Sequence, residues 1–135
     1  MRLRTVGLLA LALGVMLSAA PVKAHHSFAA EYDLTKVVTK QGYVTKVEWT
    51  NPHVWFYINV KNEDGTVTNW GFEMGPPHGL QARGWTRTTM KLGDEVIVNG
   101  TLAKNLSNRA NAKTVTMAAT GQRLGAASSQ GEDTP

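Results

Sequence analysis

Apolar and polar residues alternate over much of the chain between residues 37 and 118, in short runs separated by turn residues. Successive side chains of a strand point to opposite faces, so each alternating run predicts a half-buried strand. The Asn62-Glu63-Asp64-Gly65 segment is typical of a hairpin turn, because Asp-Gly readily adopts positive φ. The five predicted strands cover residues 37–49, 53–61, 66–74, 95–102 and 112–118.

The same alternation predicts which side chains form the core. In the second strand, Val54 to Val60 place an apolar residue at every second position, whereas Trp55 and Tyr57 fall on the opposite face. The predicted inward residues of the five strands are Tyr43, Val47, Trp49, Val54, Phe56, Ile58, Val60, Trp70, Phe72, Met74, Val96, Val98, Leu102, Val115 and Met117.

One short helix is predicted over residues 80–90, after a Gly75-Pro76-Pro77-His78-Gly79 segment that ends the third strand. Three strands, a helix and two further strands follow one another in the order of an OB-type barrel. We therefore expect an all-β fold, a small five-stranded OB-like Greek-key barrel with one short helix between strands 3 and 4. A strongly bent antiparallel sheet without closure is the structural alternative.

The first 24 residues have the three parts of a secretory signal peptide. Arg2 and Arg4 form a basic start, residues 6–17 are apolar, and Val22 and Ala24 supply small residues at the −3 and −1 positions. Cleavage after Ala24 and export to the periplasm are expected. An uncleaved membrane anchor is the alternative, but the apolar run is shorter than the roughly 20 residues that span a bilayer. No membrane span is expected after cleavage.

The remaining 111 residues suit one small domain. We expect an N-terminal arm over residues 25–36, the barrel over residues 37–120 and a disordered tail over residues 121–135, where Gly, Ala, Ser and Gln predominate. The chain has no cysteine, which excludes disulfides and thiolate metal sites.

Charge and motifs exclude several function classes. The net charge of +4 depends largely on the leader, because 11 Lys and Arg against 10 Asp and Glu remain without it. This balance argues against nucleic acid, whose binding depends on phosphate neutralisation. There is no Gly-x-Ser-x-Gly nucleophile motif and no nucleotide-binding glycine motif, and Glu48 with Glu73 would not suffice for a hydrolase. The sequence thus favours a binding role over catalysis.

Cleavage after Ala24 would make His25 the first residue, so that it offers a metal both its α-amine and its ring. A histidine brace adds a second ring, for which His53 is the best candidate, and His26 is a possible further ligand. Nitrogen ligands in a tetragonal set favour Cu(II), with zinc or nickel as less favoured ions. The 14 residues from His25 to Val38 extend about 46 Å at most, enough to reach the corner before the second strand. A copper-dependent oxidase is a third class, without any residue that specifies a substrate.

Glu31 and Asp33 are candidate acceptors that would orient a ligand ring. The simpler interpretation is that His25 and His26 are solvated and that His53 bonds to backbone at the start of its strand. His78 lies in a Pro/Gly loop and is ranked below the other three histidines as a ligand.

Four tryptophans are many for so short a chain. Trp55 and Tyr57 lie opposite the apolar face of their strand and would form an exposed platform for a small ligand or an envelope partner. The alternative is that the tryptophans fill and close the barrel.

Several motifs in a fixed order resemble a family of short exported proteins from Gram-negative bacteria, domain of unknown function 6152. They are His25-His26-Ser27-Phe28, Glu48-Trp49-Thr50-Asn51-Pro52-His53, Trp70 with Glu73-Met74-Gly75, Gly79-Leu80 with Gly84-Trp85, and Leu92-Gly93-Asp94. The resemblance covers His25 to about Leu124. It implies an exported single domain with an OB-like barrel and roles for His25, His26 and His53, but no established activity. It also implies that asparagine is more usual at His78.

Overall fold

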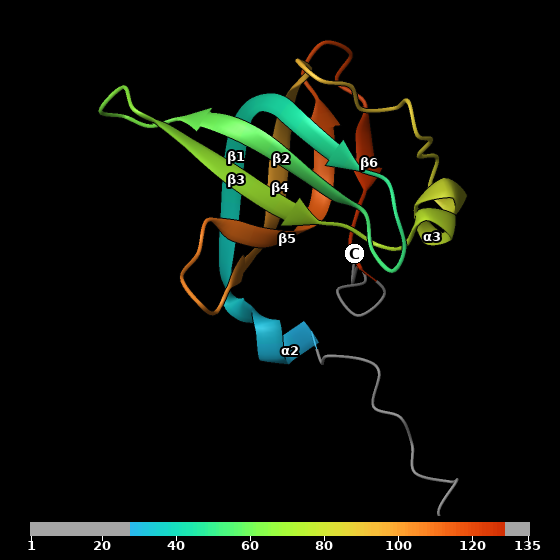
Figure 1. Ribbon diagram of the computed structural model, residues 1–135, viewed down its shortest axis with the longest axis horizontal. Helices are drawn as coiled ribbons and strands as arrows, with labels where there is room; N and C mark the ends of the chain where they lie inside the picture. The colour runs from blue at the N-terminus through green and yellow to red at the C-terminus, as the bar shows by residue number, and fades with distance from the viewer. Residues whose placement is uncertain (1–27, 129–135) are drawn as a thin grey trace, which may run out of the picture.

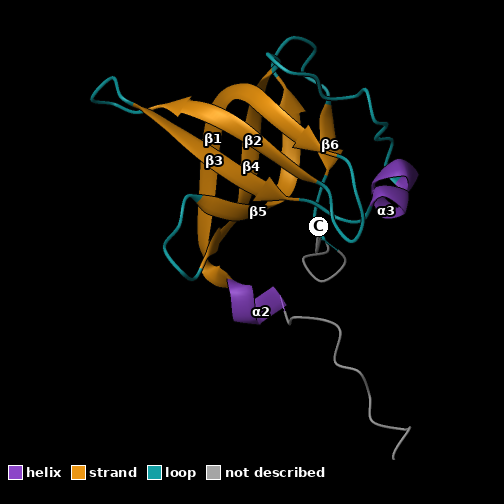
Figure 2. Cartoon of the chain, viewed as in Figure 1, coloured by secondary structure: helices purple, strands orange, loops and turns teal. Residues whose placement is uncertain are grey.

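The computed structural model describes residues 28–128, which form one six-stranded, mostly antiparallel β-sheet with two short helices (Figures 1 and 2). No helix among these residues is long and apolar enough to cross a membrane. In chain order the elements are α2 (Phe28–Glu31), β1 (Tyr32–Glu48), β2 (Trp55–Lys61), β3 (Val67–Glu73), α3 (Pro77–Ala82), β4 (Glu95–Ala103), β5 (Arg109–Met117) and β6 (Arg123–Gly125).

The strands follow the order β3-β2-β1-β4-β5-β6, and β3 additionally pairs with β5 in parallel. The first half of the long strand β1 pairs with β4 and the second half pairs with β2, with Tyr43 taking part in both pairings. Gly42 sits at this crossing. A Cβ there would lie 2.1 Å from the carbonyl oxygen of Asn59, so the close approach of β1 and β2 requires glycine.

The hydrophobic core confirms nearly all of the predicted inward residues. Side chains from β2 to β5 that were expected to face inward are buried, and Leu102 packs against them partly buried. The first strand differs: Tyr43 is 56% exposed and its neighbour Val44 is buried. A register shift between Val44 and Lys46 reverses the alternation, which simple period-two counting misses.

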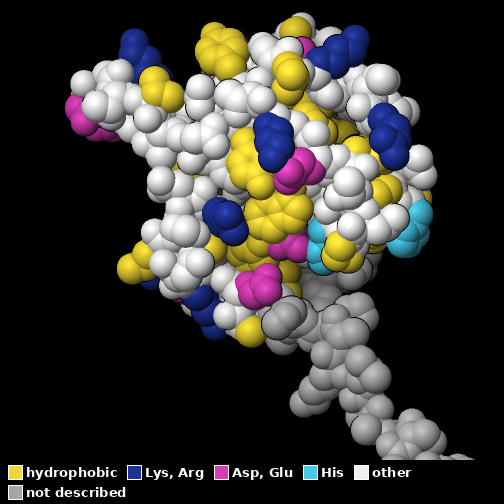
Figure 3. Space-filling model, viewed as in Figure 1, with side chains coloured by type: hydrophobic (Ala, Val, Ile, Leu, Met, Phe, Trp, Pro, Cys, Tyr) yellow, Lys and Arg dark blue, Asp and Glu magenta, His cyan; other side chains and the backbone are white. Residues whose placement is uncertain are grey.

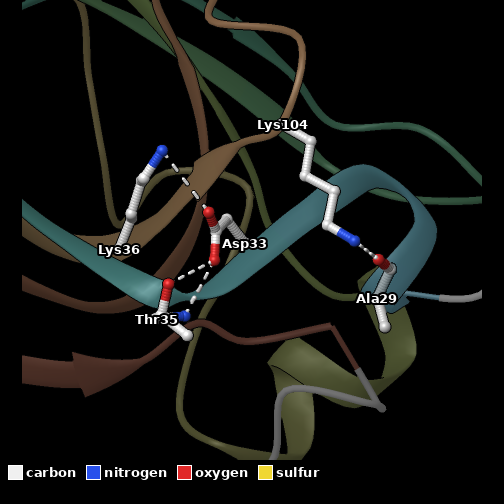
Figure 4. Close-up of polar contacts among 5 residues, drawn as sticks. All are labelled: Ala29, Asp33, Thr35, Lys36 and Lys104. Carbon is white, nitrogen blue, oxygen red and sulfur yellow. Dashed lines mark hydrogen bonds and ion pairs between the residues drawn. The ribbon is translucent and has the colours of Figure 1, made fainter.

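Strand β1 begins at Tyr32, five residues before the predicted start, so part of the expected arm belongs to the sheet. Tyr32 pairs with Ala103, and the regular ladder resumes only at Val37. Between them Asp33 accepts hydrogen bonds from the backbone N–H and hydroxyl of Thr35, at 3.0 and 2.6 Å, and pairs with Lys36 at 3.5 Å (Figure 4). This local turn interrupts the alternation and conceals the start of the strand from sequence analysis.

The predicted helix and tail also need correction. The helix α3 begins at Pro77, a favoured first position, and ends at Ala82, before Gly84 with a φ of 95°. The expected disordered tail contains β6, which pairs with β5, and its backbone carbonyl at Gly125 accepts a 2.8 Å hydrogen bond from the indole of the buried Trp85. A strand of three residues is too short to show an alternating pattern in the sequence, so these contacts could not be predicted.

Candidate functional site

His53 occupies the corner between β1 and β2, directly after the cis peptide bond between Asn51 and Pro52. Its side chain is 34% exposed. The Nδ1 atom of its ring is hydrogen-bonded to Oε1 of Glu73, near the end of β3. The predicted corner histidine is therefore held by a side chain and not by backbone, and its ring has a fixed orientation.

Glu73 is a buried carboxylate with two hydrogen-bond partners. It is 7% exposed, and the hydroxyl of the buried Tyr32 donates to its second oxygen, Oε2. Tyr32 comes from the start of β1, so one carboxylate joins the first strand, the β1–β2 corner and β3. Burying a charged carboxylate is costly unless its oxygens are satisfied, and here each oxygen has a partner.

The electrostatics of this triad favour a neutral tyrosine. Burial raises the pKa of the Tyr32 hydroxyl far above its ordinary value, and the hydrogen bond to Glu73 and the charge of Glu73 raise it further. Tyr32 therefore stays protonated at neutral pH and can donate to Glu73. Because the carboxylate faces Nδ1 of His53, the tautomer with a proton on Nδ1 is favoured, which leaves the lone pair on Nε2. Nε2 makes no hydrogen bond within residues 28–128.

The described chain begins next to this triad. The ring of Phe28 lies 4.9 Å from the ring of Tyr32, and Lys104 binds α2 through its backbone N–H to the carbonyl of Glu31, at 2.8 Å, and through Nζ to the carbonyl of Ala29 (Figure 4). The predicted ligands His25 and His26 lie outside the described residues. Phe28 follows His25 by three positions.

Within residues 28–128, no hydrogen bond or ion pair joins the remaining predicted metal-site residues to His53. Asp33 is engaged by Thr35 and Lys36 in the turn within β1, and Glu31 is exposed at the end of α2. His78 is exposed on α3. Among residues 28–128, no three His, Cys, Asp or Glu side chains gather in a way that could hold a metal ion. A complete site would need ligands from outside this range.

The predicted aromatic platform is half-buried on the outer face of β2. The Nζ of Lys46 lies 5.4 Å from the centre of the Tyr57 ring and 2.5 Å from Glu48, whose other oxygen accepts a 3.3 Å hydrogen bond from the Tyr57 hydroxyl. The guanidinium carbon of Arg109 lies 5.7 Å from the centre of the Trp55 ring. Hydrophobic side chains on the visible face are accordingly flanked by Lys and Arg (Figure 3).

The sequence does not predict Tyr32 or Glu73 as site residues. Glu73 stands out there only as a possible partner of Glu48 and within the Glu73-Met74-Gly75 motif, and Tyr32 falls in the expected N-terminal arm. One signal was present: Glu73 is a lone acidic residue between Phe72 and Met74, in a stretch that the structure buries on both faces. A charge in such a position needs an internal partner.

The fold and site define a small, mostly antiparallel β-domain with a carboxylate-bound histidine at one strand corner. A family of unknown function, DUF6152, matches residues 13–122, and the chain belongs to this family. No curated protein and no solved structure matches the chain significantly.

Proposed function

We propose that this protein is an exported, periplasmic metal-binding protein that holds copper between the first residue of its mature chain and His53. Cleavage after Ala24 provides His25 with a free amine. The amine and ring of His25 and the ring of His53 form the ligand set, and His26 is available as a further ligand. Zinc and nickel are the next ions that such nitrogen ligands favour.

The observation that carries the proposal is the hydrogen bond between Nδ1 of His53 and buried Glu73. Metal-binding histidines commonly donate their second ring N–H to a carboxylate, which fixes the ring and raises the basicity of the ligating nitrogen. Here Nε2 makes no hydrogen bond to any of residues 28–128, and it is not buried.

The position of Phe28, the first described residue, supports the same ligand pair. Tyr32 binds the carboxylate that also binds His53, and Phe28 packs against Tyr32. Three residues extend about 11 Å at most, which is the reach that the proposal allows between Phe28 and His25. The proposed route differs from the predicted long arm, because α2 and β1 hold Phe28 against Tyr32.

An OB-like Greek-key barrel is the second part of the proposal. Pairing of β3 with β5 joins the two ends of the run β3-β2-β1-β4-β5, and α3 lies between β3 and β4. These features support an OB-like Greek-key barrel.

The test is Cu(II) binding by protein exported without an N-terminal tag, with the terminus confirmed by intact mass. We expect a nitrogen-rich axial EPR signal and tight binding. Both are expected to be lost when one alanine is inserted before His25, and to be strongly reduced in His53→Ala. His78→Ala is the matched control, because His78 is exposed on α3, and it should bind copper normally. Equal weak binding by all four proteins would refute the proposal.

A further inference from the structure

A pocket of about 600 Å³ lies beside the triad, between α2, the start of β2 and the β4–β5 connection. Its volume is within the usual range for sites that bind small molecules. Its apolar wall consists of Ala30, Tyr32, Trp55 and Ala103, and its polar lining consists of Glu31, Lys104, Asn105 and Arg109.

Trp55 supplies the aromatic wall of the pocket. Its neighbours Val54 and Phe56 are fully buried in the core, so the half-buried indole lies on the outer face of β2. The parallel pairing of β3 with β5 sets Arg109 opposite Gly71. A Cβ at Gly71 would lie 3.0 Å from the Tyr57 ring and 3.7 Å from Cγ of Arg109. The absence of a side chain at Gly71 leaves the Arg109 stem room beside the aromatic rings.

Two cations, Arg109 and Lys104, line the pocket. No carboxylate among residues 28–128 lies within ion-pair distance of Arg109, and its one described interaction is with the face of Trp55. Lys104 donates to the carbonyl of Ala29, a neutral acceptor that leaves its positive charge in place. Glu31 is the single acidic side chain of the lining. An arginine that stacks on an aromatic face still presents planar donors that match a carboxylate.

We propose that this pocket binds a small organic anion, an aromatic or other planar carboxylate. Its carboxylate pairs with Arg109, and its ring packs against the apolar wall that includes Trp55. This site is distinct from the proposed copper site, with which it shares only Tyr32. Occupancy therefore needs no metal and no residue before Ala30.

The probe is 2-naphthoate, added to EDTA-treated protein and compared with the neutral 2-naphthylmethanol and the cationic 2-naphthylmethylammonium. Isothermal calorimetry gives the affinity, and the indole N–H signals in ¹⁵N spectra, assigned with Trp55→Leu, show where the probe binds. We expect naphthoate to bind in preference to both analogues and to move the Trp55 signal. Equal binding of the three probes, or shifts confined to other tryptophans, would overturn the proposal.

Substitutions of Arg109 distinguish a loss of its charge from a loss of folding. Arg109→Met is expected to weaken naphthoate binding about tenfold or more, and Arg109→Lys by less, because lysine keeps the charge without the planar fork. Arg87→Met is the matched control, an exposed arginine outside the pocket, and should leave affinity unchanged. Unchanged affinity in a folded Arg109→Met protein would refute the site. His53→Ala should retain naphthoate binding while its copper binding is strongly reduced, so each proposal can fail without the other.

Discussion

Tyr32 and Glu73 are separated by 41 positions in the sequence, and the hydroxyl of the first donates to the carboxylate of the second in a buried contact. This bond attaches the start of β1 to the end of β3. It also leaves the other oxygen of Glu73 to hold His53. The orientation of the histidine ring thus depends on a tyrosine that never touches it in any described contact.

Removing the Tyr32 hydroxyl should lower the stability of the fold. Tyr32→Phe keeps the ring packing but leaves one oxygen of buried Glu73 without its donor, at a cost of about 1–3 kcal/mol. Urea unfolding measures this loss. Tyr57→Phe is the control, because its hydroxyl makes a 3.3 Å bond to Glu48 in a half-buried setting, and it should cost at most about 1 kcal/mol. Equal losses in the two variants would contradict the assigned role of Tyr32.

Ionisation of the Tyr32 hydroxyl should lower the stability of the fold at alkaline pH. The pKa of Tyr32 is raised in the folded protein, mainly by burial, whereas an unfolded tyrosine ionises near pH 10. Its contribution is therefore fully present below about pH 10 and declines as the pH rises further, by up to about 1.4 kcal/mol per pH unit.

Comparison with Tyr32→Phe isolates this contribution from that of other titrating groups. The difference in unfolding free energy between wild type and variant should shrink as pH is raised above about 10. A difference that stays constant from neutral to strongly alkaline pH would show that Tyr32 does not titrate differently in the two states.

Gly42→Ala should be strongly destabilising. The added methyl group would approach the backbone carbonyl of Asn59, which cannot move away as a flexible side chain could. The expected cost is about 1–3 kcal/mol or more. Gly79→Ala in α3 is the comparison: its Cβ would meet only the Pro76 ring, at 3.5 Å, so thermal unfolding should shift little or slightly upward.

Glu73→Gln should weaken copper binding if His53 is a ligand. Glutamine retains the shape of the side chain but loses the charge that favours a proton on Nδ1 of His53. Loss of such a supporting carboxylate typically reduces metal affinity about 10- to 100-fold. Competition with a chelator of known affinity measures the change, and Glu48→Gln is the control on the outer face, where Glu48 pairs with Lys46. Copper affinity that falls equally in both variants would point to a general charge effect.

Sequence periodicity was sufficient for the core but not for the contacts that order the site. Phe56, Ile58 and Val60 alternate with less buried residues, and burial follows that alternation directly. The place of Tyr32 in β1 could not be predicted, because the residues of the Asp33 turn that follow it have no regular alternation. Strands without a periodic signal, such as β6, are held by partners distant in the chain, and one sequence does not identify those partners.

The candidate site was predicted in part for the same reason. His53 was singled out because it follows the Asn51-Pro52 break and is one of only four histidines. Its carboxylate partner depends on the register of β2 against β3, which pairs Trp55 with Glu73 and brings the carboxylate to the end of the strand beside the corner. Period-two patterning specifies the face of a residue, and register requires the packed sheet.

The turn at Asp33 divides β1 into a long ladder and a detached first residue pair, Tyr32 with Ala103. The segment before Val37 can therefore separate as a local cooperative unit while the core stays intact, since few buried contacts hold it. Hydrogen exchange should detect this opening as protection lost well below the free energy of global unfolding. A metal bound by both His25 and His53 would hold the segment before Val37 in its closed position. The residence time of that metal would then depend on how often the segment opens.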